Sequence, residues 1–235
     1  MITLLVRFRV ICVMVSKRDA PFTSFVMVSC SVIFLITLFK SDELFYDLIL
    51  RYGVVPSLLV SGRGLHTLVT YMFFHAGFQH IVTNMFVFLS VGRTVEREIG
   101  TGKFSAIYLG SGMIAALAHA GLDPSSSVPV IGASGAIFGL IAILLLFMPF
   151  EITTALIIPL PGVVVGILLM LIEVFSLVTG PTSTVAHDIH LYGFFIGGIA
   201  AFSMDYNRAL RGLMIAVIIL VALYMWAVYF NGLSF

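Results

Sequence analysis

The chain has 235 residues, of which 60% are hydrophobic and only 10% are charged, and its formal net charge is +1 at pH 7. A soluble domain averages about 25% charged residues, so this composition excludes an ordinary soluble protein. The near-neutral charge also gives no support for nucleic-acid binding. Long apolar runs, without the alternation of barrel strands, separate short charged clusters. The composition therefore predicts an all-α polytopic protein of the lipid bilayer.

Taken in chain order, residues 1–21 come first and are interrupted by four basic residues. We interpret them as a cytoplasmic N-terminal segment, neither a span nor a clear signal peptide. Seven later segments are apolar over about the 20 residues that a membrane-spanning helix needs. They are residues 22–39, 67–92, 103–121, 132–149, 156–178, 186–205 and 211–231.

Basic residues predict the orientation, because cytoplasmic loops carry an excess of Lys and Arg. With the N-terminus inside, nine basic residues lie on the inner side and three on the outer side. The inner residues are Arg7, Arg9, Lys17, Arg18, Arg93, Arg97, Lys103, Arg208 and Arg211, and the outer ones are Lys40, Arg51 and Arg63. Seven spans then place the C-terminus outside, and we expect the membrane to be the cell membrane.

Two connecting segments differ in character. Within residues 40–66, apolar side chains recur at helical spacing between Leu44 and Tyr52, which predicts a helix lying in the outer interface. The segment TGPTSTVA at 179–186 is small and polar, as a mobile lid would be. Of the two cysteines, Cys12 and Cys30, neither has a spacing that suggests a disulfide or a zinc site.

Polar residues inside the predicted spans gather at one depth. They are His75, Gln79, His80 and Asn84 in the second span, Ser134 in the fourth, and His187, Asp188 and His190 in the sixth. These three spans all run from outside to inside, and Ser134 and His190 each lie near the outer start of their spans. Asn84 lies about 13 Å above the inner boundary at 1.5 Å per residue, and it shares a helix face with His80. Their common depth indicates one site in the outer half of the bilayer.

The chemistry that this site permits is acyl transfer. A serine needs a base to act as a nucleophile, and neutral histidine is the usual one. The tetrahedral intermediate needs hydrogen-bond donors, which His80, Asn84 and the backbone N–H of Ser134 can supply. Each piece alone has a structural alternative: Gly135 and Gly139 form a GxxxG packing motif, and the other side chains could bridge helices. Convergence of all three sets favours a site.

Four blocks together resemble the rhomboid family of intramembrane serine proteases, from about residue 52 to residue 205. They are YGVVP (52–56) with TYMFFHAGFQHIVTNM (70–85), GRTVEREIG (92–100), GASGAIFG (132–139) and HLYGFFIG (190–197). The second block fits the pattern GxxxExxxG and the last fits HxxGxxxG. The resemblance implies a six-helix catalytic core at residues 22–205 and an additional C-terminal transmembrane helix within residues 206–235.

The resemblance also implies roles for individual residues. Ser134 would be the nucleophile and His190 the base of a Ser-His dyad. Around them, His80 and Asn84 would donate to the oxyanion, Gly132 and Gly135 would shape its pocket, and Phe138 would lie against the catalytic histidine. Elsewhere, Gly193 and Gly197 would allow close helix packing, Glu96 would brace the inner turn, and His75 would be structural.

Three polar residues near this set have competing interpretations. His187 could replace His190 as the base, but the HxxGxxxG spacing favours His190. Asp188 is disfavoured as a third catalytic residue, because residues two apart on a helix point to different sides. Glu173 either hydrogen-bonds near the site or reaches the outer interface, and the interface is favoured.

The sequence thus predicts an intramembrane serine endopeptidase that cleaves in or near the transmembrane helices of membrane-protein substrates, without a metal or other cofactor. The alternative is a proteolytically inactive rhomboid-like protein that binds membrane proteins, although such proteins typically lack the serine or the histidine. A transporter would show inverted repeats, and a zinc metalloprotease would carry HExxH. Neither feature is present.

Overall fold

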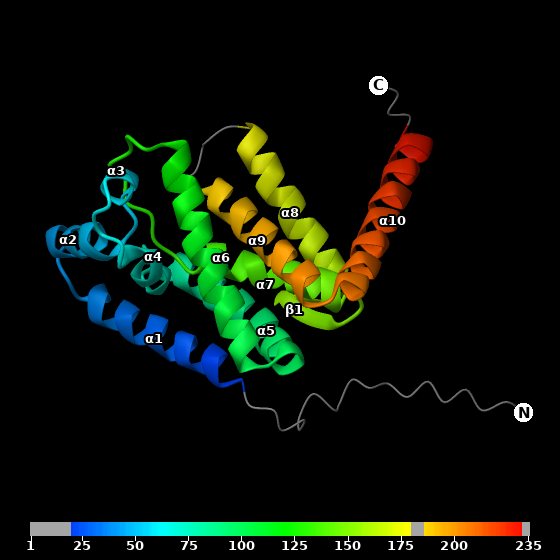
Figure 1. The fold of residues 1–235 in the computed structure, drawn as a ribbon, viewed down its shortest axis with the longest axis horizontal. Coiled ribbons are helices and arrows are strands. Elements are labelled where there is room, and N and C mark those ends of the chain that lie inside the picture. Colours follow the sequence, from blue (N-terminus) through cyan, green and yellow to red (C-terminus); the bar gives the residue numbers. More distant parts are fainter. Residues whose placement is uncertain (1–19, 180–185, 232–235) are drawn as a thin grey trace, which may run out of the picture.

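In the computed structural model, which describes residues 20–179 and 186–231, the chain is an all-α polytopic bundle with one small β-hairpin (Figure 1). The first elements are α1 (Pro21–Leu38), α2 (Asp42–Tyr52), α3 (Pro56–Val60), α4 (Thr67–Thr70), the 3₁₀ helix η1 (Tyr71–Phe73), α5 (Phe78–Ile99) and α6 (Thr101–Leu122). They are followed by α7 (Ser134–Phe147), β1 (Ile152–Leu156), β2 (Ile158–Pro161), α8 (Gly162–Thr179), α9 (His187–Met204) and α10 (Tyr206–Asn231). Most of the predicted N-terminal segment and lid lies outside the described residues.

Helix α7 is the centre of the bundle. Every residue from Gly135 to Phe147 is buried, and α5, α6, α8, α9 and α10 all contact this helix. A helix that is apolar on all sides needs such complete cover. Its 14 residues give a length of about 21 Å, against a hydrocarbon core of about 30 Å. If α7 reaches one face of the membrane, it begins well below the other.

Among the residues that the structure describes, fewer helices qualify as independent spans than the seven that the sequence predicted. By length and composition, α1, α6, α8 and α10 can each cross a membrane, and a bent helix pair would make a fifth span. Helix α7, predicted as residues 132–149, is too short. Helix α9 begins with the polar residues His187, Asp188 and His190. Both helices pack most extensively against each other and against α6, so they do not need a lipid-like surface.

The span predicted at residues 67–92 is two helical pieces. Residues 67–73 meet α5 at an angle of 98°, and Gly77 between them is fully extended, with φ −177° and ψ 177°. The Tyr71 hydroxyl donates to the carbonyl oxygen of Gly112 at 2.8 Å. The Thr70 hydroxyl donates to the carbonyl oxygen of Tyr52 at 2.7 Å. These contacts to other elements hold the first piece out of line with α5.

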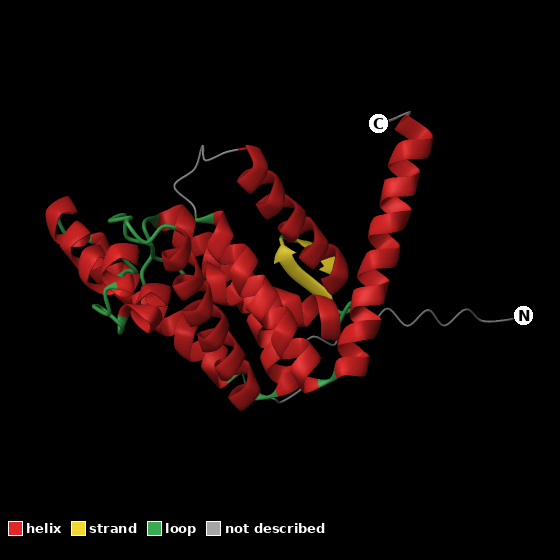
Figure 2. Ribbon diagram, turned by 45° about the horizontal axis from the view of Figure 1, so that its top comes forward, coloured by secondary structure: helices red, strands yellow, loops and turns green. Residues whose placement is uncertain are grey.

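The span predicted at residues 156–178 also begins later than expected, at Gly162. Strands β1 and β2 pair antiparallel before it, with Leu156 opposite Ile158 and the turn residue Ile157 at φ 72° (Figure 2). Proline has no N–H for a helical hydrogen bond, and Pro159 and Pro161 therefore delay the start of the helix. The hairpin is fixed to α5 by a 2.6 Å hydrogen bond between the hydroxyls of Ser90 and Thr153.

Two peripheral helices complete the bundle. Helix α2 occupies the segment in which the sequence predicted a surface helix, and none of its residues is buried. Helix α10 is attached near its start, where Arg208 Nε donates to the carbonyl oxygen of Phe147 at 3.0 Å. It then leans away from α8 (Figures 1 and 2), and an apolar cavity of about 750 Å³ lies between α8, α9 and α10.

Candidate active site

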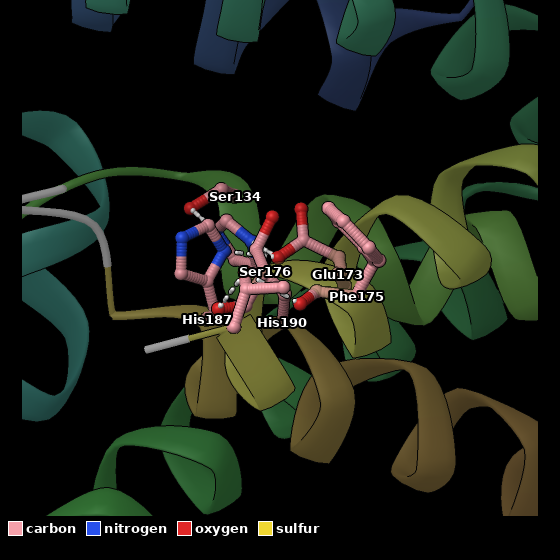
Figure 3. A network of polar contacts seen from close by, with 7 residues as sticks. Ser134, Glu173, Phe175, Ser176, His187 and His190 are labelled. Carbon is pink, nitrogen blue, oxygen red and sulfur yellow. Dashed lines mark hydrogen bonds and ion pairs between the residues drawn. The ribbon is translucent and has the colours of Figure 1, made fainter. Parts of the chain in front are cut away.

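Ser134 and His190 meet at the end of the bundle where α5, α7 and α9 begin, which we call the site end. Ser134 is the first residue of α7 and His190 lies in the first turn of α9. His190 Nε2 lies 2.7 Å from Ser134 Oγ, a hydrogen-bond distance (Figure 3). The Phe138 ring stacks on the imidazole, with 4.6 Å between centroids and 9° between planes. The serine is partly exposed and the histidine is buried.

Glycines bring α9 close enough to α7 for this contact. A side chain at Gly193 would collide with the carbonyl oxygen of Gly135, and one at Gly197 with that of Gly139. A side chain at Gly135 would begin 2.6 Å from Ile189 Cγ2 on α9. The two helices therefore touch backbone to backbone, and Ser134 and His190 lie on this closely packed pair of elements.

His80 faces the same place from α5. Its Nδ1 accepts a hydrogen bond from the backbone N–H of Ala76 at 3.3 Å, which places the ring proton of a neutral imidazole on Nε2. A Cβ at Gly132 would lie 2.9 Å from that Nε2 and 3.7 Å from Ser134 Oγ. Gly132 also has φ +130°, which side chains rarely allow. A small residue here leaves the imidazole N–H facing the nucleophile.

Asn84 and His75 flank His80. The Asn84 Nδ2 donates to the carbonyl oxygen of His80 at 3.0 Å, within the same helix. Its Oδ1 is buried and has no hydrogen-bond partner among the described residues. His75 is buried as well, with its ring edge-on to that of His80 at 5.0 Å. His80 and Asn84 on α5 and His75 just before that helix therefore form one polar group.

Glu173 does not lie where the sequence prediction favoured it, at the outer membrane interface. The residue is 7% exposed, and its side chain lies beside two histidines (Figure 3). Oε2 is 2.6 Å from His187 Nδ1 and 3.0 Å from His190 Nδ1. A carboxylate in an apolar environment is costly unless it is paired, and α8 and α9 run antiparallel, which brings Glu173 level with the start of α9. The cost of an unpaired carboxylate and the antiparallel course of the two helices were the features of the sequence that could have indicated this pairing.

Comparison with known proteins now identifies the family. The family model described as the Rhomboid domain matches residues 62–207, which is more than half of the chain. The chain belongs to the rhomboid family. Its all-α polytopic architecture agrees with this membership.

Three curated relatives of this rhomboid illustrate the match. Rhomboid protease GluP of Bacillus subtilis (strain 168) is 34% identical over 99 residues, covering 42% of this chain and 19% of that protein. RHOMBOID-like protein 5 of Arabidopsis thaliana is 29% identical over 152 residues, covering 65% and 48%. RHOMBOID-like protein 7 of the same plant is 32% identical over 145 residues, covering 61% and 44%. The chain thus spans less than half the length of these relatives.

Asp188 contacts a histidine of another helix. Its Oδ2 lies 2.6 Å from Nδ1 of His119, at the end of α6. That Asp188 is not a third catalytic residue stays a prediction. His119 escaped notice in the sequence because it lies ahead of the GASG block and outside every family pattern. The His119–Asp188 pair joins α6 to α9 at the site end of this rhomboid.

Glu96 lies at the opposite end of the bundle. Its carboxylate accepts hydrogen bonds from the backbone N–H groups of Phe22 at 2.9 Å and Thr23 at 2.8 Å. It also accepts from the hydroxyls of Thr23 at 2.6 Å and Thr101 at 2.9 Å. An acidic group at a helix N-terminus satisfies N–H groups that have no partner within the helix. Glu96 thus joins the start of α1 to the turn between α5 and α6.

Proposed function

We propose that this rhomboid is an intramembrane serine endopeptidase that hydrolyses peptide bonds in or near transmembrane helices of other membrane proteins. The observation that carries the proposal is the 2.7 Å contact between His190 Nε2 and Ser134 Oγ at the start of a buried helix. A serine and a histidine at this distance are the two groups that acyl transfer to an enzyme hydroxyl requires. Inactive relatives typically lack one or the other, so the presence of both favours the protease over the binding protein.

The proposed reaction uses Ser134 and His190 in turn. Ser134 Oγ bonds to the scissile carbonyl carbon while its proton moves to His190 Nε2. The carbon–nitrogen bond then breaks, and His190 returns that proton to the leaving nitrogen. Water attacks the acyl-serine in the same way, with His190 taking its proton, and this step releases the second product and restores Ser134.

The oxyanion would lie among three donors that belong to two elements, α5 and α7. The N–H of Ser134 is one of the first in α7, which have no partner within the helix and carry the positive end of its dipole. His80 supplies its Nε2–H, and Asn84 supplies the amide N–H that is not bonded to its own helix. Such donors stabilise the charge of the transition state because they are already oriented before it forms.

The substrate would approach from the bilayer and the water from the aqueous side nearest Ser134. Following the positive-inside pattern, the N-terminus is cytoplasmic and the site end faces outward. A regular substrate helix hides its carbonyls in its own hydrogen bonds, so it must unwind locally before Ser134 can attack. We therefore expect substrates with helix-weakening residues such as Gly or Pro in the outer part of their spans.

The decisive experiment is labelling of the purified protein with a fluorophosphonate probe, together with cleavage of a transmembrane substrate. We expect Ser134→Ala to abolish both, and His190→Ala to reduce cleavage to background while the protein stays monodisperse. Loss of nucleophile and base together should be no worse than loss of either, because the two act as a unit. Near wild-type cleavage by either single variant would mean that the catalytic assignment is wrong.

A further inference from the structure

Glu173 is the exceptional residue of the second half of α8. From residue 168 to residue 179, all of which the structure describes, it is the only buried residue. Its neighbours Phe175 and Val178 are 69% and 79% exposed. In a membrane helix the apolar side chains face the lipid, and a rare ionisable side chain turned toward the bundle interior points to function, so the partners of Glu173 on α9 require explanation.

One of those partners is Nδ1 of His190, the ring nitrogen that does not contact Ser134. His190 Nε2 faces Ser134 at 2.7 Å, and Nδ1 lies 3.0 Å from Glu173 Oε2. This is an ion-pair distance, and His190 Nδ1 has no hydrogen-bond partner among the described residues. A carboxylate beside Nδ1 favours the tautomer with the proton on that nitrogen. Nε2 is then unprotonated and able to accept the proton of Ser134.

We propose that Glu173 is a positioning residue for the base, so that the site works as Ser134, His190 and Glu173 rather than as a dyad. This inference rests on the proposed protease function. Glu173 holds the proton of His190 on Nδ1 and presents Nε2 to Ser134. When Nε2 takes the serine proton, the carboxylate faces the positive imidazolium. His187 bonds to the same oxygen at 2.6 Å and keeps the carboxylate in place.

The principal variant is Glu173→Gln, which keeps the size of the side chain. Its amide can donate to Nδ1 and hold the wrong tautomer of His190. We expect kcat to fall about 100-fold. This loss is well below the roughly 10⁴-fold loss for the corresponding change in a serine protease triad. KM for the transmembrane substrate should stay within about threefold, because the effect belongs to the transition state. The labelling rate of Ser134 should fall with kcat.

Three control variants separate positioning from simple bridging of helices. Asp188→Asn removes a histidine–carboxylate contact of the same 2.6 Å length on the same helix but without contact to His190, and should keep wild-type turnover. His187→Ala removes the shorter contact to Glu173 and leaves the one to His190, so its loss should be under about tenfold. Glu173→Asp keeps the charge and should retain clearly more turnover than Glu173→Gln.

The outcomes distinguish this inference from the proposed function. If Ser134→Ala still cleaves substrate, the protease assignment itself fails. If Ser134→Ala is silent but Glu173→Gln keeps wild-type kcat, only the role of Glu173 fails. The role of Glu173 also fails if Glu173→Gln changes only KM, or if His187→Ala lowers kcat as much as Glu173→Gln does. All variants are compared as monodisperse protein. If Glu173→Gln does not fold, Glu173→Asp decides, since background turnover in that folded variant contradicts the proposal.

Discussion

Helices α8 and α9 flank the same central helix but are held in different ways. Helix α9 lies so close to α7 that Gly193 and Gly197 touch carbonyl groups of the facing helix. Helix α8 is packed firmly only in its first half, where Gly166 lies against Leu145. Beyond that point Glu173 is its only buried residue. Ser134 and His190 thus lie on the close contact between α7 and α9, whereas the second half of α8 has only Glu173 to hold it.

The largest effect is expected from breaking the rigid contact. Gly193→Val would place a branched side chain against the backbone of Gly135, which cannot move without displacing Ser134 next to it. We expect a loss of stability above about 4 kcal/mol, the range typical of severe core disruption, and thus no monodisperse protein. Thermal unfolding and size-exclusion chromatography in detergent measure this.

The matched control lies five residues along α9. A Cβ at Gly198 would meet nothing nearer than Leu146 Cδ1 at 4.0 Å, so Gly198→Ala should fold and cleave normally. Equal tolerance of both substitutions would show that the α7–α9 contact is not the rigid part of the molecule.

The loosely held helix gives the next prediction. Joining α5 and α8 at their site ends, through cysteines at Phe78 and Val178, should block cleavage of a transmembrane substrate. Labelling of Ser134 by a small fluorophosphonate should continue, because that probe does not need to pass between helices. Both assays are run before and after cleavage of a reducible bifunctional thiol reagent, on a background without Cys12 and Cys30.

Single-cysteine variants treated with the same reagent are the control for chemical modification. If the cross-linked protein still cuts the full substrate at its original rate, the substrate does not pass between α5 and α8.

A smaller loss is expected from the oxyanion donors on α5. His80→Ala and Asn84→Ala should each lower kcat by about 10- to 1000-fold, the usual scale for one such donor, and leave KM almost unchanged. His75→Ala is the comparison, since its ring contacts His80 rather than Ser134. Unchanged turnover in both donor variants would remove α5 from the proposed mechanism.

Much of this arrangement was predictable from the sequence, because the relevant signals are local. Polar residues in apolar spans are few, and spacing alone set His80 and Asn84 on one face and Ser134 and His190 at one depth. The GxxxG pattern also indicated close packing around α7. The roles assigned to these residues remain proposals, and their placement is what the structure adds.

What the sequence did not reveal depends on contacts between distant segments. The bend before α5 is held by Thr70 and Tyr71 through carbonyl groups of other elements. The hairpin before α8 is held by Ser90. Glu173 was assigned to the interface because its distance from the end of the span was counted along one helix. Its pairing with His187 and His190 appears only when α8 is laid against α9.

The smallest effect is expected at Glu98. This exposed residue lies just two positions after the buried Glu96. Glu98 forms a 2.6 Å ion pair with Arg208, and both side chains are more than one third exposed. Exposed pairs contribute about 0–1 kcal/mol, so Glu98→Ala should hardly change thermal stability or turnover.

Glu96 is 2% exposed and accepts four hydrogen bonds, two of them from backbone N–H groups of α1. Glu96→Ala leaves those buried donors unpaired, at about 1–3 kcal/mol each, and should lower stability by several times more. Similar unfolding temperatures for the two variants would contradict the assignment of Glu96 as the anchor of α1.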